Sequence, residues 1–223
     1  MALSGSGGAY YRSNATIPSS VGLHSNYTRH MWVKSSIAPS ASNFRLLGGH
    51  VGAGQNPHEL LDWNHSSSSY VRSNQHRASS GAYTPIQFAA PSTGAWHAMG
   101  CTFGDGEFKG YVDGAVDGST TGVPDSGSSD VEIQLLGAMS FGGLLDVSSQ
   151  CAEFEVAEYA YWNVALTADE MASLAKGFKA FRIRPQNLVF YSPCIRLLQE
   201  MKGGRTLVKQ AGTDTPVSHP PVR

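Results

Sequence analysis

Apolar and polar residues alternate with a period of two through much of the chain, most clearly between residues 95 and 119. This period is typical of β-strands, because successive side chains of a strand point to opposite faces of the sheet. Segments 97–103, 107–112 and 115–119 are therefore predicted to be three short strands. One face of the first strand carries Met99, Cys101 and Phe103. In the second strand, Phe108, Gly110 and Val112 share one face, and Lys109 and Tyr111 share the other.

Two turns rich in glycine connect these strands. Gly104-Asp105-Gly106 contains two glycines, which adopt positive φ without strain. Asp113-Gly114 is the signature of a type I′ turn, in which both central residues have positive φ and the turn follows the twist of the strands. The three segments are thus predicted to form an antiparallel meander.

Further segments with the character of strands lie on both sides of the meander. The best alternation is in 27–34, where Tyr27, Arg29, Met31 and Val33 oppose Thr28, His30, Trp32 and Lys34. Further candidates are 44–47, 70–72, 83–89, 131–136, 154–162, 188–191, 195–198 and 206–209. Segment 58–63 fits either a strand or a helical turn. The pattern as a whole predicts an all-β chain.

One helix is predicted after residue 166. Thr167 and Glu170 form a capping box, in which each side chain accepts a hydrogen bond from the backbone N–H of the other residue. Leu166 and Met171 can pack together as a hydrophobic staple. The apolar residues that follow have helical spacing: Met171, Leu174, Ala175 and Phe178.

Two blocks carry a family resemblance. The first joins Trp96-His97, an alternating strand, a Gly/Asp turn and Tyr111-Val-Asp-Gly114. The second is 156–171, with a late strand, Trp162-Asn-Val-Ala-Leu-Thr167 and the short helix. Both are similar to the laminin-G-like, concanavalin-A-like lectin/glucanase superfamily. The resemblance implies an antiparallel jelly-roll β-sandwich with one short helix after the late strand. It does not imply a particular function, because proteins with this fold have many different functions.

The size of the chain fits one domain. It has 223 residues, 25 glycines and 15% charged residues, as a large, turn-rich all-β domain would. We expect the lectin-like sandwich to span 10–211. A Gly/Ser-rich flexible arm would precede it at 1–9, and a Thr-, Pro- and His-rich arm would follow at 212–223.

Charge and hydropathy narrow the range of partners. The formal net charge is −1 and the pI is about 6.7, which argues against a nucleic-acid partner, since such a protein would carry a basic patch. The chain has no apolar run of about 18 residues and no pattern of a membrane-surface helix, so no membrane partner is predicted. The first residues lack the features of a secretory signal. Three widely spaced cysteines, Cys101, Cys151 and Cys194, fit a reduced setting better than a disulfide framework.

Three carboxylates on the late strand suggest a candidate glycoside-hydrolase site. Retaining β-glucanases of the superfamily carry a Glu-x-Asp-x-x-Glu pattern, and this chain has Glu153-Phe-Glu155-Val-Ala-Glu158. Retaining hydrolysis needs two carboxyl groups about 5 Å apart, and the additional methylene of Glu155 would disturb that spacing. Glu158 also fits the strand of non-catalytic members of the family. We therefore expect solvated or structural carboxylates.

Other catalytic and metal sites are weakly supported. His58-Glu-Leu-Leu-Asp62 has aspartate where a zinc-protease helix needs its second histidine. No Gly-x-Ser-x-Gly elbow is present, Cys101 falls on a core face, and His97 fits a satisfied sandwich residue. A calcium site at the rim of the sandwich is an alternative, because four aspartates lie in predicted turns or loops: Asp105, Asp117, Asp125 and Asp130. Their spacing is not that of a known calcium-ligand series, and an aspartate in a turn usually bonds to its own backbone. No catalytic, metal-binding or cofactor-binding residue is predicted.

Sugar-binding faces usually present aromatic side chains. The candidates are Tyr10, Tyr11, Trp63, Tyr70, Tyr83 and Tyr111. Each of them fits a core position equally well, so the sequence alone selects no sugar site.

The predicted function follows from resemblance. A single lectin-like domain with no signal, no catalytic set and a Pro/His-rich tail is similar to bacteriophage structural chains. This implies a non-enzymatic virion protein, either a capsid decoration protein or a lectin-like protein of the tail or fibre. It would be made in the host cytoplasm and assemble with other virion proteins. Homo-oligomerisation and contact with surface glycans are left open. The alternatives are a carbohydrate-binding module outside a virion and a β-glucanase-type hydrolase.

Overall fold

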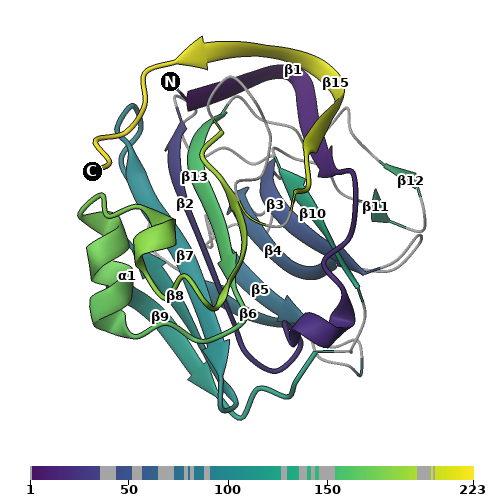
Figure 1. Cartoon of the computed structure of the whole chain (residues 1–223), viewed down its shortest axis with the longest axis vertical. Helices are drawn as coiled ribbons and strands as arrows, with labels where there is room; N and C mark the ends of the chain where they lie inside the picture. Colours follow the sequence, from purple (N-terminus) through teal and green to yellow (C-terminus); the bar gives the residue numbers. More distant parts are fainter. Residues whose placement is uncertain are drawn as a thin grey trace.

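The computed structural model describes residues 2–35, 44–51, 57–64, 73–77, 80, 83–87, 91–126, 130–135, 140–141, 144–145, 154–194, 202 and 204–223 (Figure 1). The first strands are β1 (Ala2–Ser13), β2 (Tyr27–Ser35), β3 (Phe44–Val51), β4 (Pro57–Asn64), β5 (Ser73–Arg77) and β6 (Tyr83–Gln87). The middle strands are β7 (His97–Gly104), β8 (Glu107–Val112), β9 (Ala115–Thr121) and β10 (Val131–Leu135). The last strands are β11 (Ser140–Phe141), β12 (Leu144–Leu145), β13 (Phe154–Trp162), β14 (Leu188–Ser192) and β15 (Leu207–Val217). The helices are α1 (Ala168–Ala175) and the 3₁₀ turns η1 (Ser19–Val21) and η2 (Ala180–Arg182).

Hydrogen bonds join thirteen strands into one antiparallel sheet that folds over into two layers. The order is β6-β5-β4-β3-β10-β1-β13-β2-β7-β8-β9, with β14 beside β13 and β15 beside β1. β1 connects the layers, because residues 3–5 pair with β13 and residues 11–12 pair with β10. Between the layers, Ile86 of β6 packs in one apolar cluster with Met99 and Phe108. The described part of the chain therefore confirms the predicted antiparallel β-sandwich with a short helix after the late strand.

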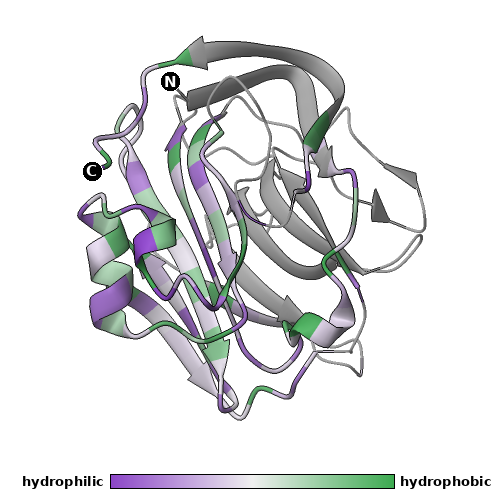
Figure 2. Ribbon diagram, in the orientation of Figure 1, coloured by the Kyte–Doolittle hydropathy of each residue, from purple (hydrophilic) through white to green (hydrophobic). Residues whose placement is uncertain are grey.

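A third layer covers the outer face of β13, β2, β7 and β8. It contains α1, η2 and the C-terminal residues 218–223, which lie close to α1 (Figure 1). An apolar cluster joins this layer to the sheet: Tyr111, Ala160, Trp162, Leu166, Met171, Leu174, Ala180, Leu188 and Tyr191. In Figure 2, α1 accordingly shows both hydrophobic and hydrophilic residues. In the described residues, no helix is both long and apolar enough to cross a bilayer.

The central meander is confirmed as strands β7, β8 and β9. Both turn residues of Asp113-Gly114 have positive φ, at 50° and 82°, as a type I′ turn requires. In the preceding turn, the two residues with positive φ are Asp105 and Gly106 rather than the two glycines. The face assignments also hold, because Phe108 is in the core between the layers and Tyr111 packs under the third layer.

The two ends of the chain, predicted to be arms, form paired strands over much of their length. Residues 2–9 belong to β1, residues 212–217 belong to β15, and these strands pair with each other from Ala2–Val217 to Ser13–Leu207. The Gly-rich segment 2–9 and the Gly, Asp and Pro residues within 212–217 disfavour strands, so this pairing is a product of tertiary context. The division into a domain at 10–211 and separable arms stays a prediction.

One local prediction needs correction, and one open choice is settled. Phe178 was predicted to continue the apolar stripe of the helix, but α1 ends at Ala175 and Phe178 is 45% exposed. The reason is Gly177, whose φ of 88° turns the chain out of the helix. Segment 58–63 lies in β4, so His58 and Asp62 are not one helical turn apart. Segments 70–72 and 195–198, together with Cys151 and Glu153, lie outside the described residues.

Candidate functional site

A groove of about 240 Å³ lies where the start of α1 meets the outer face of the meander. We call it the α1 groove. Its walls come from β7, β8, β9, the turn between β7 and β8, and the approach to α1. The lining residues are Thr102, Gly104, Asp105, Glu107, Lys109, Tyr111, Val116, Ala165, Leu166, Thr167 and Ala168. Because it is smaller than the pockets that hold drug-sized ligands, the groove suits one small polar group.

The lining of the α1 groove mixes polar and apolar groups. Three of its side chains carry hydroxyl groups, namely Thr102, Tyr111 and Thr167. Leu166 and Val116 supply apolar surface, and Val116 is 48% exposed. A cleft with a few convergent polar groups over an apolar floor is the usual form of a small-ligand site.

An ion pair crosses the polar side of the groove. Nζ of Lys109 lies 2.7 Å from Oε2 of Glu107, two residues away on the same face of β8. The bond to Glu107 raises the pKa of Lys109, so the side chain is cationic at neutral pH. The groove thus presents one ammonium and one carboxylate side by side, a pair that can donate to and accept from a polyhydroxylated ligand.

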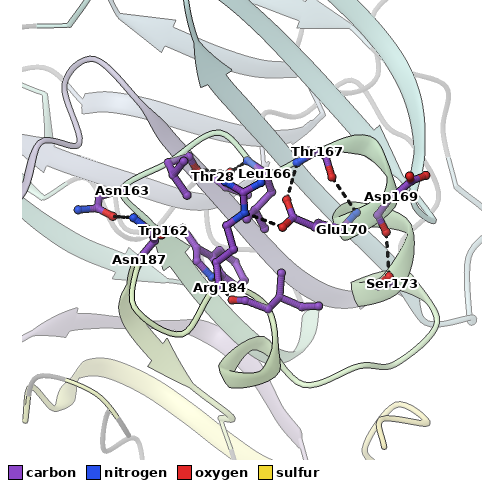
Figure 3. Close-up of polar contacts among 12 residues, drawn as sticks. Thr28, Trp162, Asn163, Leu166, Thr167, Asp169, Glu170, Ser173, Arg184 and Asn187 are labelled. Carbon is purple, nitrogen blue, oxygen red and sulfur yellow. Dashed lines mark hydrogen bonds and ion pairs between the residues drawn. The ribbon is translucent and has the colours of Figure 1, made fainter.

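The start of α1 is held by a network of polar contacts (Figure 3). The predicted capping box is present: Oγ1 of Thr167 accepts from the N–H of Glu170 at 3.3 Å, and Oε2 of Glu170 accepts from the N–H of Thr167 at 2.8 Å. The other carboxylate oxygen of Glu170 accepts from Nε of Arg184 at 2.6 Å. Burial acts to raise the pKa of Glu170, but the bonds from Arg184 and Thr167 outweigh it, so the pKa is lowered.

A second set of contacts fixes the segment before α1 to the sheet. Oγ1 of Thr28 donates to the carbonyl of Val164 at 2.7 Å and accepts from the N–H of Leu166 at 2.8 Å. The indole of Trp162 donates to the carbonyl of Ile183 at 2.8 Å. One wall of the groove is therefore preorganised, because the backbone of Leu166 is bonded to Thr28 of β2.

Among the aromatic candidates, Tyr111 lines the α1 groove. Tyr11 is buried in the core between the layers. Tyr70 lies outside the described residues, and the side chains of Tyr10, Trp63 and Tyr83 are not described. Sequence alternation had placed Lys109 and Tyr111 on one face, and that was the available signal for this site. The opposite wall, 165–168, is far away in the sequence, which is why the groove itself was not predicted.

The carboxylates of the late strand lie in different environments. Glu155 pairs with Nζ of Lys34 at 3.0 Å and stays partly exposed. Glu158 is 3% exposed and sits at a β-bulge, where the register with β2 shifts and its φ is 55°. Its Oε2 accepts from the hydroxyl of Tyr191 at 2.5 Å, and its Oε1 lies 3.2 Å from Nε2 of His219. Both carboxylates thus have cationic or hydroxyl partners, as expected of structural groups.

Burial shifts the acid–base behaviour around Glu158. Desolvation raises the pKa of Tyr191 far above its usual value, and the neighbouring carboxylate adds to the effect, so Tyr191 is a proton donor. Desolvation likewise raises the pKa of Cys194 to about 12, so this thiol is not a thiolate at neutral pH. Cys101 is also buried, as predicted.

The stability of the fold is expected to fall in acid because of His30. Burial lowers its pKa from 6.5 to about 4, and the nearby carbonyl of Glu158 opposes this without forming a well-directed hydrogen bond. Between about pH 6.5 and 4, the unfolded chain takes up a proton that the folded chain does not. The free energy of unfolding should therefore drop by about 3 kcal/mol over this range. Urea unfolding at several pH values measures the slope, and His30→Gln should remove most of it; an unchanged slope would contradict this assignment.

His97 makes contacts at both ring nitrogens. Nδ1 lies 2.8 Å from Oδ2 of Asp113, and Nε2 lies 3.1 Å from both Oγ and the carbonyl oxygen of Ser92. The other carboxylate oxygen of Asp113 accepts from the N–H of Ala98 at 2.9 Å. The order resembles an acid–imidazole–hydroxyl triad, but these bonds tie the Asp113-Gly114 turn to the start of β7. His97 is therefore satisfied, as the sequence suggested.

The aspartates proposed as a calcium alternative do not converge. Asp130 accepts from the N–H of Ser19 at 2.9 Å and from Oγ1 of Thr16 at 3.3 Å. Asp105 lies in the turn between β7 and β8, next to the α1 groove. Among the residues that the structure describes, no three His, Cys, Asp or Glu side chains are close enough to hold a metal ion together.

The two-layer antiparallel sandwich and its short helix place the protein in the class of lectin-like β-sandwich proteins. Comparison with family models gives the family. The model described as the concanavalin A-like lectin/glucanases superfamily, Laminin_G_3, matches residues 6–172. The chain belongs to this family, and the family resemblance predicted from the two sequence blocks is confirmed. No curated protein matches the sequence.

Solved structures share the fold at low sequence identity. A heptameric SAP-like pentraxin from Limulus polyphemus is 14% identical with a TM-score of 0.61, covering 78% of this chain and 81% of that one. A candidate carbohydrate binding protein from Bacteroides ovatus is 12% identical with a TM-score of 0.67, covering 98% of this chain and 60% of that one. The botulinum neurotoxin serotype D binding domain is 13% identical with a TM-score of 0.57, covering 78% of this chain and 42% of that one. The last two chains are thus much longer than the part this protein matches.

Proposed function

We propose that this protein is a non-enzymatic carbohydrate-binding module and that it binds one saccharide unit in the α1 groove. The observation that carries the proposal is the lining of the groove, where hydroxyl groups and the Lys109–Glu107 ion pair converge over apolar surface. Family membership supports it, since lectins are part of the superfamily name. The similarity in fold to a candidate carbohydrate binding protein is consistent with it.

The groove is suited to a neutral or weakly charged sugar. The ammonium of Lys109 and the carboxylate of Glu107 neutralise each other, and Asp105 adds a second carboxylate to the lining, so the groove does not favour an anionic ligand. A sugar ring presents hydroxyl groups that both donate and accept, and C–H surfaces that pack on apolar side chains such as Val116. The proposal therefore rests on complementary hydrogen bonding and modest apolar contact, which predicts weak affinity for a single unit.

Glycan-array screening of the full chain, followed by titration of the best sugar, tests the proposal. Lys109→Met should weaken binding by about tenfold or more, because a charged hydrogen bond to the ligand is lost and Glu107 is left without its partner. Lys34→Met is a matched control, because Lys34 forms a similar ion pair with Glu155 outside the groove. The proposal is wrong if no glycan binds, or if Lys109→Met and Lys34→Met bind equally well.

The virion role stays a prediction. Family membership is compatible with a capsid decoration or tail protein, but it does not select one, because the fold hosts many functions. The predicted assembly partners, the location in a virion and the lack of enzymatic activity likewise stay predictions. Mass spectrometry of purified particles for this chain would test the virion role directly.

A further inference from the structure

A second surface of the third layer combines aromatic and cationic side chains. We call it the basic–aromatic face, and it consists of Lys176, Phe178, Lys179, Phe181 and Arg182. Phe178 and Phe181 are 45% and 41% exposed, and they are two of the four exposed large apolar residues among those described. Nζ of Lys179 lies 6.0 Å from the ring centre of Phe181. Lys176 and Arg182 are also exposed.

The charged residues of this surface are all basic. Residues 171–199 contain five Lys or Arg residues and no Asp or Glu, in a chain whose net charge is −1. Of the cations in the described part of that segment, Arg184 is paired with Glu170, whereas Lys176, Lys179 and Arg182 belong to the face. The acidic residues of the layer, Asp169 and Glu170, lie at the opposite end of α1.

A further cation lies beside the face. The N–H of Arg223 donates to the carbonyl of Gly177 at 2.7 Å, which places Arg223 next to Phe178 in space. Two segments that are far apart in the sequence therefore bring positive charge to the same part of the surface. The net charge of the whole chain does not reveal this cluster.

One of the two aromatic rings is held by a packing contact. Phe181 packs edge-on against the buried ring of Tyr191, with centroids 6.1 Å apart. The backbone beside Phe178 is anchored, because the N–H of Gly177 donates to the carbonyl of Leu174. Part of the cost of ordering this surface is therefore already met in the free protein.

We propose that the basic–aromatic face docks onto an anionic lipid surface. Phenylalanine has no polar atom, and its partial insertion at the boundary between headgroups and acyl chains removes apolar surface from water. The surrounding Lys and Arg side chains would meet the anionic headgroups, which attract basic clusters. Peripheral binding of this kind needs no apolar run through a bilayer, so the lack of one in the sequence does not oppose it.

A lipid surface fits better than the other partners of similar charge. Protein interfaces are depleted of lysine, whereas two of the three cations of the face are lysines. Sugar sites are concave, and the groove described above lies at the other end of α1 from these residues. Phe rings with a lysine rim are instead typical of proteins that lie on membranes.

Cosedimentation of the full chain with lipid vesicles tests the proposal. Vesicles of phosphatidylcholine with about 30% phosphatidylserine should bind the protein, vesicles of phosphatidylcholine alone should bind it at least tenfold less, and salt should weaken binding. Lys176→Gln with Lys179→Gln should cost about 25-fold, at about fivefold per cation. Phe178→Ser with Phe181→Ser should cost about tenfold without any change in charge.

Val208→Ser is the matched control for the aromatic variant, because Val208 is 42% exposed on β15, outside the face. Its binding should equal that of the unchanged protein. Equal binding to both kinds of vesicle, or no binding to either, would overturn the proposal. So would binding that survives both double variants, or binding that dextran sulfate abolishes while the Phe variant remains unaffected, since the latter is the result expected for a polyanion site. Because two independent variants are used, misfolding of one leaves the test intact.

Discussion

The Gly100→Ala variant is expected to lose about 3 kcal/mol or more of unfolding free energy. Gly100 lies in β7 opposite His30 of β2. A Cβ atom at this position would overlap the carbonyl oxygen of Arg29 and lie 2.8 Å from Cε of Met171. The methionine can move, but the carbonyl cannot, because β2 is bonded to β13 on one side and to β7 on the other.

The same substitution should disturb the third layer as well. Met171 is a buried residue of α1, and the end of its side chain rests on Gly100, so the side chain must repack between the helix and the sheet. Urea unfolding measures the loss of stability. Gly94→Ala is the control: its φ is 78° and no atom lies within 4 Å of the added Cβ, so backbone strain alone should cost about 1 kcal/mol. Equal losses in the two variants would contradict the steric argument at Gly100.

The sequence predicted correctly those elements whose structure is determined by residues close to one another in the chain. The meander follows from alternation around Asp113-Gly114, and the start of α1 follows from the Thr167–Glu170 capping box. In each case, the residues that determine the structure are within a few positions of one another. Such signals need no knowledge of the rest of the fold.

Features that depend on distant contacts could not be predicted in this way. The pairing of β1 with β15 joins opposite ends of the chain through segments of low strand propensity. The α1 groove needs the approach to α1 to lie against β8, and only its Lys109–Tyr111 wall had a pattern in the sequence. The basic–aromatic face was hidden because the helix was expected to continue through Phe178, which would have buried that side chain.

The bulge at Glu158 is the clearest case of a residue whose role depends on its surroundings. Sequence comparison with glucanases suggested a cleft carboxylate, and the residue was expected to be solvated or structural. Register with β2 shifts between Ala157 and Ala160, so the bulge turns Glu158 to the outer face under the C-terminal segment. There, Tyr191 and His219 contact its two oxygens. The carboxylate thus links β13, β14 and the chain end.

The Glu158→Ala variant is accordingly expected to lose about 3 kcal/mol of unfolding free energy, because the buried hydroxyl of Tyr191 loses its acceptor and His219 loses its contact with the carboxylate. Glu155→Ala is a matched control on the same strand: its partly exposed pair with Lys34 should be worth no more than about 1 kcal/mol. Chemical unfolding of both variants provides the comparison.

A double-mutant cycle of Glu158→Ala with His219→Ala then isolates the contribution of the C-terminal segment. The stability losses of the two single variants should be far from additive if Glu158 holds that segment to the sheet. Strict additivity, or similar losses for Glu155→Ala and Glu158→Ala, would show that the buried carboxylate does not fasten the chain end.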